Sequence, residues 1–263
     1  MTVSIHDLRA WRSRGERFSM VTAYDALSAR ICDEAQIPVL LVGDSLAQVL
    51  LGYETTLPVT MEEMLHHARA VARGARNALL VGDMPFGSYN GSREEAVRNA
   101  SAFLKVGMHS VKLEGAGHRV ELVRELVQGG IPVMGHLGLT PQFVNQFGGY
   151  RVQGRGDAGD ALVRDAHALQ EAGVFALVLE CVPAELGSRV TSELDVPTIG
   201  IGAGPGTDGQ VLVLQDLLGL TPGPSPRFVK RYADLASDMT SALQRFAKEV
   251  SEGAYPSDEH TYS

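Results

Sequence analysis

The sequence predicts an α/β protein, a (β/α)8 TIM barrel with an additional N-terminal helix and C-terminal helices. Short apolar runs alternate with helical segments along the whole 263-residue chain. The runs are rich in Val, Leu, Ile and Ala, as is typical of parallel strands buried on both faces. No linker interrupts this alternation, so we expect residues 1–263 to form one TIM-barrel domain. A doubly wound open sheet is the alternative arrangement.

Eight apolar runs have the length and composition of buried strands. They lie at Phe18–Ala23, Ile37–Val42, Ala78–Val81, Ser110–Leu113, Pro132–Met134, Val174–Leu179, Thr198–Ile201 and Val211–Leu214. Eight strands separated by helices are the number that closes this type of barrel.

The segments between these runs are predicted to be helices. They cover residues 25–36, 60–75, 94–107, 118–130, 159–173 and 184–194, with terminal helices between Val229 and Glu252. Two of the helices are preceded by a Ser or Thr with a Glu three residues later, which is the sequence of a capping box. These pairs are Thr60 with Glu63 and Ser92 with Glu95.

The composition argues against several classes of protein. A formal charge of −8 and a pI near 5.5 do not suit a general binder of nucleic acid or anionic membranes. No apolar run approaches the ~18 residues that span a bilayer, and the N-terminal segment lacks the apolar stretch of a secretory signal. Cys32 and Cys181 have no partner spacing, which suits a reducing compartment. We therefore expect a cytoplasmic protein that binds neither nucleic acid nor membrane.

Charged side chains stand at the ends of the predicted strands. Asp44 follows VLLVG, Asp83 follows ALLVG, Lys112 and Glu114 belong to VKLEG, and Glu180 follows FALVL. A carboxylate at the end of a buried run costs free energy unless it is paired or binds a metal. Because the C-terminal ends of barrel strands meet at one rim, these side chains predict one shared catalytic site. The alternatives are that Asp44 and Asp83 cap the following helices, and that Lys112 and Glu114 form a structural ion pair.

Carboxylates without an accompanying His–Cys cluster favour a hard, oxygen-loving metal ion. Magnesium binds to one or two carboxylates, keeps several waters and leaves positions for substrate oxygens. Zinc would be expected to recruit His or Cys, and the sequence has no HxxxH or CxxC motif. His136 also stands at a strand end, so we expect it to lie behind the site residues or to contact the substrate.

Several long motifs, in order along the chain, resemble those of the ketopantoate hydroxymethyltransferase (3-methyl-2-oxobutanoate hydroxymethyltransferase) family. They are VTAYDA, VGDSLAQVLLGYETTLPVTMEEMLHHARAVARGA, GDMPFGSYN, VKLEG, PVMGHLGLTPQ, VNQFGGYRVQGR, VLECVP and IGIGAGPGTDGQVLV. The chain departs from the family pattern at Ala47 and Gln48, where Gly and Met are expected, and at Gln215, where His often precedes Asp216. Neither departure involves the charged residues at the strand ends.

The resemblance implies an enzyme that transfers a hydroxymethyl group from 5,10-methylenetetrahydrofolate to 3-methyl-2-oxobutanoate. The product would be 2-dehydropantoate, in pantothenate biosynthesis, and the reaction would pass through a Mg-stabilised enolate. One Mg²⁺ per subunit and a homodecamer are also implied. By family match, Asp44, Asp83 and Glu114 serve the metal, with Glu114 acting through water; Asp44, Ser45, Asp83 and Lys112 serve the oxo acid; and Glu180 accepts the proton.

Two other classes of function would use a similar rim. A Mg²⁺-dependent barrel lyase of the isocitrate lyase or phosphonopyruvate type would cleave or rearrange C–C bonds in 2-oxo acids. Such enzymes generally carry a reactive Cys in a KKCGH-like loop, which this sequence lacks. A non-catalytic scaffold is the second class, and the complete set of strand-end acids argues against it.

Overall fold

The computed structural model describes residues 2–262. The chain divides into two compact units, one ending at Val213 and the other beginning at Leu214. Every residue predicted to act in the site belongs to the first unit. It remains a prediction that the whole chain, including the C-terminal segment, forms one catalytic domain.

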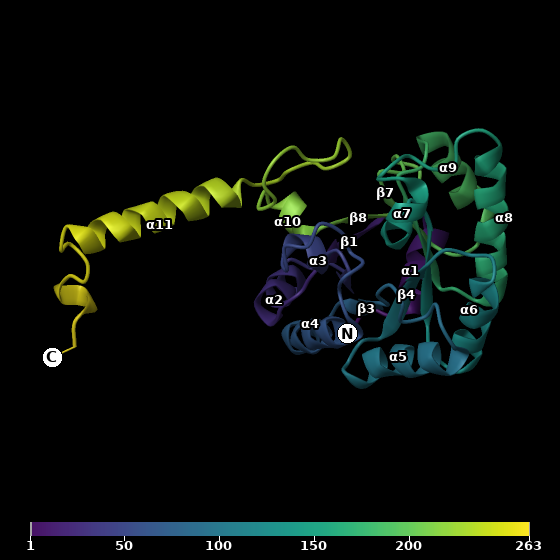
Figure 1. Ribbon diagram of the computed structural model, residues 1–263, viewed down its shortest axis with the longest axis horizontal. Coiled ribbons are helices and arrows are strands. Elements are labelled where there is room, and N and C mark those ends of the chain that lie inside the picture. Colours follow the sequence, from purple (N-terminus) through teal and green to yellow (C-terminus); the bar gives the residue numbers. More distant parts are fainter. Residues whose placement is uncertain (1, 263) are drawn as a thin grey trace. The chain divides into compact units, whose positions relative to one another are not determined.

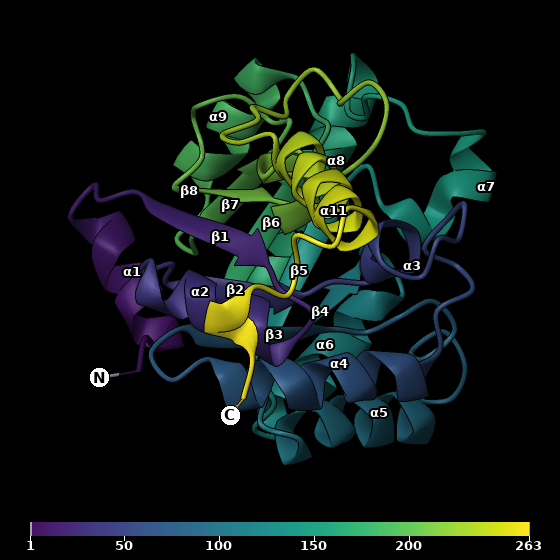
Figure 2. The same ribbon diagram turned by 90° about the vertical axis from the view of Figure 1, so that its left-hand side faces the viewer.

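The first unit is a closed barrel. Among the described residues, eight parallel strands pair in chain order, and β8 pairs with β1 to complete the ring. Figure 2 shows the strands surrounded by helices. This topology confirms the predicted TIM barrel and excludes the open sheet. The strands are β1 Phe18–Thr22, β2 Val39–Val42, β3 Leu79–Asp83, β4 Ser110–Glu114, β5 Val133–Gly138, β6 Ala176–Glu180, β7 Thr198–Ile201 and β8 Gly209–Leu212.

The helices of this unit lie outside the strands (Figure 1). They are α1 Ile5–Ser13, α2 Ala26–Glu34, α3 Leu46–Val49, α4 Met61–Gly74, α5 Arg93–Lys105, α6 Arg119–Gln128, η1 Pro141–Phe143, α7 Val144–Phe147, α8 Asp157–Ala172 and α9 Ala184–Glu193. The capping box at Thr60 and Glu63 forms both of its bonds. At Ser92 the hydroxyl accepts from the Glu95 N–H, but no reciprocal bond from Glu95 is found in the described chain, so the second predicted box is half formed.

Several strands are longer at the rim than the sequence predicted. The predicted runs ended before the charged residues, whereas β3 ends at Asp83, β4 at Glu114 and β6 at Glu180. Backbone pairing continues through these polar positions, because each of them has a partner on the neighbouring strand. The eighth strand begins at Gly209, two residues before its predicted start, because Gly209 pairs with Phe18 of β1.

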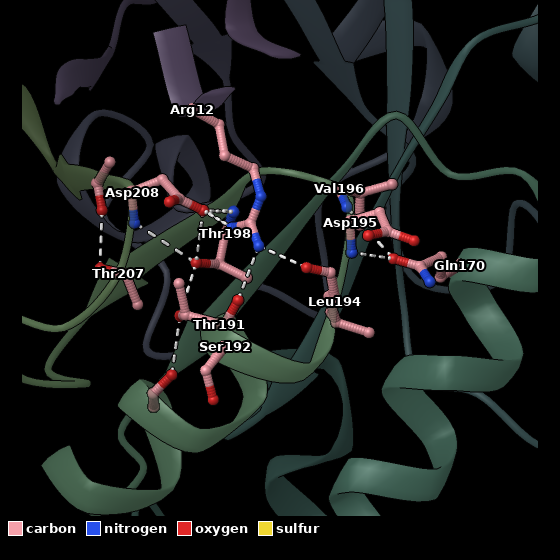
Figure 3. Close-up of polar contacts among 12 residues, drawn as sticks. Arg12, Gln170, Thr191, Ser192, Leu194, Asp195, Val196, Thr198, Thr207 and Asp208 are labelled. Atoms are coloured by element: carbon pink, nitrogen blue, oxygen red, sulfur yellow. Dashed lines mark hydrogen bonds and ion pairs between the residues drawn. The ribbon is translucent and has the colours of Figure 1, made fainter. Parts of the chain in front are cut away.

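The N-terminal helix α1 is fixed to the end of the barrel opposite the strand-end acids. Leu8 is fully buried in the core cluster that contains Phe18 and Met20. Arg12 donates to the carbonyl oxygen of Thr191 at 2.8 Å, to that of Leu194, and to the Asp208 carboxylate (Figure 3). The same carboxylate oxygen of Asp208 accepts from the Thr198 N–H at 2.8 Å, at the first residue of β7. One guanidinium therefore joins α1, the end of α9 and the start of β7.

Arg12→Ala is expected to lower the free energy of unfolding by about 2 to 3 kcal/mol, because charged hydrogen bonds are lost and Asp208 loses its cation. Chemical denaturation measures this change. The control is Arg9→Ala on the same helix, where the side chain is exposed and the expected change lies within about 0.5 kcal/mol. Equal effects of the two variants would contradict a role for Arg12 in joining these elements.

The second unit contains α10 Leu214–Leu217, α11 Leu235–Ser251 and the short η2 Asp258–His260. This confirms the predicted C-terminal helices. In α11 the apolar residues Met239, Leu243, Phe246 and Val250 recur at helical spacing, and each is about half exposed or more. The Phe246 ring lies edge-on to Tyr255, with centroids 5.5 Å apart. No helix within residues 2–262 is long and apolar enough to cross a membrane.

Candidate active site

The predicted charged residues converge at the C-terminal rim of the barrel. Asp44 stands two residues after β2, while Asp83 and Lys112 are register partners at the ends of β3 and β4. Glu114 ends β4 and is paired in register with His136 of β5. These five residues are almost completely buried, with no more than 4% of any of them exposed. The strand ends thus bring together polar groups that are up to 92 residues apart in the chain (136 minus 44).

Lys112 lies between two carboxylates. Its Nζ is 2.7 Å from Asp83 Oδ1 and 3.7 Å from Glu114 Oε1. Burial alone would lower the pKa of Lys112, but Asp83, Glu114 and Asp44 together raise it above its ordinary value. Lys112 is therefore a permanent positive charge at the centre of the acidic cluster. Its closer partner is Asp83 on the adjacent strand rather than Glu114 on its own.

His136 joins two acids on opposite sides of its ring. Nδ1 is 3.3 Å from Glu114 Oε1, and Nε2 is 3.3 Å from Glu180 Oε2. Burial and Lys112 disfavour the charged ring, but contacts with Glu114 and Glu180 outweigh them and raise the pKa of His136 to about 9. Glu180 is the more accessible of the acids, with 17% of its side chain exposed. His136 thus lies between Glu114 and Glu180, with each ring nitrogen near one carboxylate.

Asp44 and Asp83 lie close together, joined through the backbone of Asp44. The Asp44 N–H donates to Asp83 Oδ2 at 3.1 Å, and Asp44 Oδ2 accepts from Gln142 Nε2 at 2.9 Å. Burial, with Asp83 and Glu114 nearby, raises the pKa of Asp44 well above its usual range. Burial also raises the pKa of Asp83, against the opposing charge of Lys112. An additional cation beside these two side chains would stabilise their ionised forms.

The oxygen atoms at this site suit a magnesium ion, which does not need a complete set of protein ligands. Within residues 2–262, no three His, Cys, Asp or Glu side chains are arranged to enclose a metal. Magnesium does not require such a cage, because one or two carboxylates suffice when water and substrate supply the other oxygens. Asp83 Oδ1 and Glu114 Oε1 are buried and accept no well-aligned hydrogen bond from the described residues. Asp44 and Asp83 could hold the ion, with Glu114 behind them.

Two residues of the cluster were not predicted from the sequence. Gln142, in η1, donates from its side chain to Asp44 and from its backbone N–H to Glu114 Oε2 at 3.1 Å. Tyr89, in the loop after β3, donates to Gln142 Oε1 at 2.6 Å and accepts from the Glu114 N–H at 3.2 Å. Both lie in motifs noted above, GDMPFGSYN and PVMGHLGLTPQ, but nothing in the spacing showed that their side chains face inward.

Tyr89→Phe is expected to lower the free energy of unfolding by about 1 to 3 kcal/mol, because Gln142 and Glu114 each lose a buried partner. Urea denaturation measures this loss. Tyr53→Phe is the control, since Tyr53 is 41% exposed and its hydroxyl can remain hydrated. If Tyr89→Phe were as stable as that control, the Tyr89 hydroxyl would contribute nothing to the cluster.

Ser45 lies next to Asp44, and its hydroxyl is 2.8 Å from the Tyr24 hydroxyl. This contact holds the Ser45 side chain beside the carboxylate pair. Ser45 is thus near the rim, as the family resemblance implied, and its role in binding a substrate remains a prediction.

The segment that carries Glu180 is held by a close backbone approach. The Leu139 N–H donates to the Glu180 carbonyl at 2.8 Å. Gly138 has a φ of +95°, and a Cβ at this position would lie 2.2 Å from the same carbonyl oxygen. Only glycine combines this backbone conformation with this spacing. The end of β5 thus fixes the position of the Glu180 backbone at the rim.

Comparisons with known proteins agree on one family. The family model described as ketopantoate hydroxymethyltransferase matches residues 2–258. The 3-methyl-2-oxobutanoate hydroxymethyltransferase of Frankia casuarinae is 56% identical over 260 residues, covering 98% of this chain and 88% of that protein. The enzyme of the same name from Thermotoga neapolitana is 57% identical over 249 residues, covering 94% and 92%.

More distant solved structures share the fold. A phosphonopyruvate hydrolase crystallised with oxalate and Mg²⁺ has a TM-score of 0.63 at 15% identity, covering 100% of this chain and 92% of that one. A 2,3-dimethylmalate lyase has a TM-score of 0.61 at 17% identity, covering 99% and 92%. The full-length family match and the high identity to named enzymes confirm the resemblance seen in the motifs: the chain belongs to the ketopantoate hydroxymethyltransferase family.

Proposed function

We propose that the protein transfers a hydroxymethyl group from 5,10-methylenetetrahydrofolate to 3-methyl-2-oxobutanoate. The product is 2-dehydropantoate, a precursor of pantothenate. The names of relatives that are 50 to 57% identical support this activity. The observation that carries the proposal is the buried cluster of Asp44, Asp83 and Lys112, which offers both a cation site and a fixed positive charge to a 2-oxo acid.

One Mg²⁺ per subunit is part of this proposal, held by Asp44 and Asp83, with Glu114 acting through water. Held there, the ion would supply positive charge that polarises the ketone of the oxo acid and offsets the negative charge left when the C3 proton leaves. Lys112 and Ser45 bind the oxo acid, and the charge of Lys112 offsets the negative charge that develops on it. Gln142 and Tyr89 orient Asp44 and Glu114 through hydrogen bonds.

Glu180 is the proton acceptor in this scheme. It is the most exposed acid of the cluster, and His136 holds its carboxylate at 3.3 Å. After Glu180 takes the C3 proton, C3 forms a bond to the methylene carbon of the donor. The two bonds from that carbon to the folate nitrogens break and water supplies the hydroxyl group, while the C3 proton and the other proton of the water end on the two nitrogens. The protein thus supplies both a base and fixed charges to the reaction.

A lyase that uses a cysteine is the competing function. The nearest thiol to the acids belongs to Cys181, directly after Glu180. Burial and the neighbouring Glu180 raise the pKa of Cys181 to about 11, so the reactive thiolate is scarce at neutral pH. The site therefore favours the transferase over a cysteine-dependent lyase.

A coupled assay for 2-dehydropantoate, with and without a chelator, tests the proposal. We expect formation of product from 3-methyl-2-oxobutanoate and the folate donor, and its loss when the metal is removed. Formation of product in full chelation would refute the metal role. Cleavage of 2-oxo acids without the folate would instead identify a lyase.

We also propose that the protein assembles into a homo-oligomer, a decamer by family resemblance. The exposed apolar stripe of α11 supports association with further copies, since a row of large apolar side chains is costly in water. Sedimentation velocity at micromolar concentration measures the assembly. A stable monomer would contradict the proposal.

The cytoplasmic location remains a prediction.

A further inference from the structure

A cavity beside the loops that follow β4 and β5 contains two charged side chains that the proposed mechanism does not use. Its volume is about 390 Å³, and it lies where the loop after β4, residues 137–147 and helix α8 meet. Arg119, the first residue of α6, and Asp165, on α8, both line it. These two helices lie side by side outside the strands (Figure 1).

Arg119 is placed unfavourably for the stability of the fold. Only 9% of it is exposed, and its Nε forms no hydrogen bond with any described residue. Within residues 2–262 no carboxylate forms an ion pair with its guanidinium. It also stands at the N-terminus of a helix, where the helix dipole disfavours a positive charge. A buried cation with these disadvantages is better explained by a ligand that accepts its hydrogen bonds.

Aromatic rings form the wall next to this cation. The guanidinium carbon is 4.8 Å from the centroid of the Phe143 ring and 5.8 Å from that of Tyr89. Phe143 and Phe147 also line the cavity, with their centroids 6.5 Å apart. Aromatic faces beside a cationic edge suit a flat ring that carries hydrogen-bond acceptors.

Asp165 supplies the complementary acceptor. Its side chain is partly buried and forms no hydrogen bond or ion pair with the described residues. Burial raises the pKa of Asp165, with the charge of Arg164 opposing this change. One cavity thus offers N–H donors from Arg119 and carboxylate acceptors from Asp165. A ligand that matches both presents a carbonyl oxygen and N–H groups on one planar ring.

The cavity lies against the ends of two strands that carry groups of the proposed site. Gly115, which lines it, directly follows Glu114, and Gly138, which also lines it, is the register partner of Glu180. The backbone at the ends of β4 and β5 therefore belongs both to the wall of the cavity and to the rim.

We propose that this cavity binds the reduced pterin ring of the one-carbon donor, with the 4-oxo oxygen on Arg119, the 2-amino and N3–H groups on Asp165, and the ring beside the aromatic wall that includes Phe147. This inference rests on the proposed function, because the folate donor is what brings a pterin to the site. It assigns a binding site to the head of the donor rather than to its glutamate tail.

Calorimetric titration tests this assignment with three probes: tetrahydrofolate, 6-methyltetrahydropterin and p-aminobenzoylglutamate. Arg119→Met and Asp165→Asn are each expected to weaken binding of the first two probes by about 10-fold or more, the size of a lost charged hydrogen bond. Binding of p-aminobenzoylglutamate should not change. In steady-state kinetics, KM for the folate donor should rise while KM for the oxo acid does not.

The controls are Glu121→Gln and Glu171→Gln, exposed residues on the same two helices that do not line the cavity. Both should bind all three probes like the wild type. Arg119→Met should keep or raise the melting temperature, because a buried unpaired charge is removed. A lower melting temperature would mean that Arg119 serves the fold.

If the two variants weakened the binding of p-aminobenzoylglutamate alone, the cavity would bind the tail of the donor and not its pterin ring. Unchanged binding of all three probes would show that the donor does not use this cavity. Failure of the proposed function itself is seen separately in the wild type, as the absence of product from the oxo acid and the folate donor.

Discussion

Replacing Glu180 with glutamine is expected to slow the exchange of the C3 hydrogen of 3-methyl-2-oxobutanoate with deuterated water by at least ~10²-fold, the usual effect of losing a general base. Glutamine keeps the shape of the side chain and can still contact His136, whose Nε2 is 3.3 Å from Glu180 Oε2. It cannot accept the proton. NMR measures the exchange with Mg²⁺ and without folate, which separates proton abstraction from transfer of the one-carbon unit.

The matched control is Glu185→Gln, an exposed glutamate in the first turn of α9. It should exchange the C3 hydrogen at the wild-type rate. Binding of the oxo acid to Glu180→Gln, measured by calorimetry, should survive, because the charges that hold the substrate lie on other strands. Exchange at the normal rate in Glu180→Gln would place the base elsewhere.

The second large effect is expected for Asp83→Asn. The substitution removes the charge of one proposed metal ligand while keeping its shape, so both Mg²⁺ affinity and activity should fall. Raising the Mg²⁺ concentration should recover part of the activity, because the defect is in binding. A direct measure is thermal unfolding with and without Mg²⁺, since an ion ~100-fold above its Kd adds about 2.7 kcal/mol of stability.

Asp83 also pairs with Lys112 at 2.7 Å, so the variant loses stability even without metal. Melting in chelator measures this loss separately. Asp157→Asn, an exposed residue on α8, should gain as much stability from Mg²⁺ as the wild type does. An Asp83→Asn protein that is fully active in chelator would show that Asp83 is not a ligand.

The fold could be predicted because the chain repeats one physical pattern. Each strand of a parallel barrel is buried on both faces and therefore reads as a short apolar run. The positions of Asp44, Asp83, Lys112, Glu114 and Glu180 at the rim followed from the same pattern, since each stands at the end of such a run. Strand ends were less predictable, because the acids continue the backbone pairing even though they break the apolar sequence.

The contacts within the site could not be predicted in the same way. Lys112 lies closest to Asp83 because the two are register partners. The register between two strands cannot be predicted from the sequence of either strand alone. Gln142 and Tyr89 enter the cluster from loops, where side-chain direction depends on the path of the chain in space. Arg119 is a similar case, because from the sequence it is an ordinary first-turn residue of a polar helix.

The close approach at Gly138 has a consequence for how this enzyme can change over evolutionary time. Any side chain there would press on the Glu180 carbonyl from 2.2 Å and on Val182 from 2.8 Å, so the first mutation would displace the proposed base. Gly148 shares the left-handed backbone but has open space around it, and Asn or Asp can occupy such a position. Substitutions of Gly148 can therefore be neutral, whereas every substitution of Gly138 is expected to displace Glu180. A library of variants under selection for growth should keep position 138 as glycine and tolerate Asn at 148.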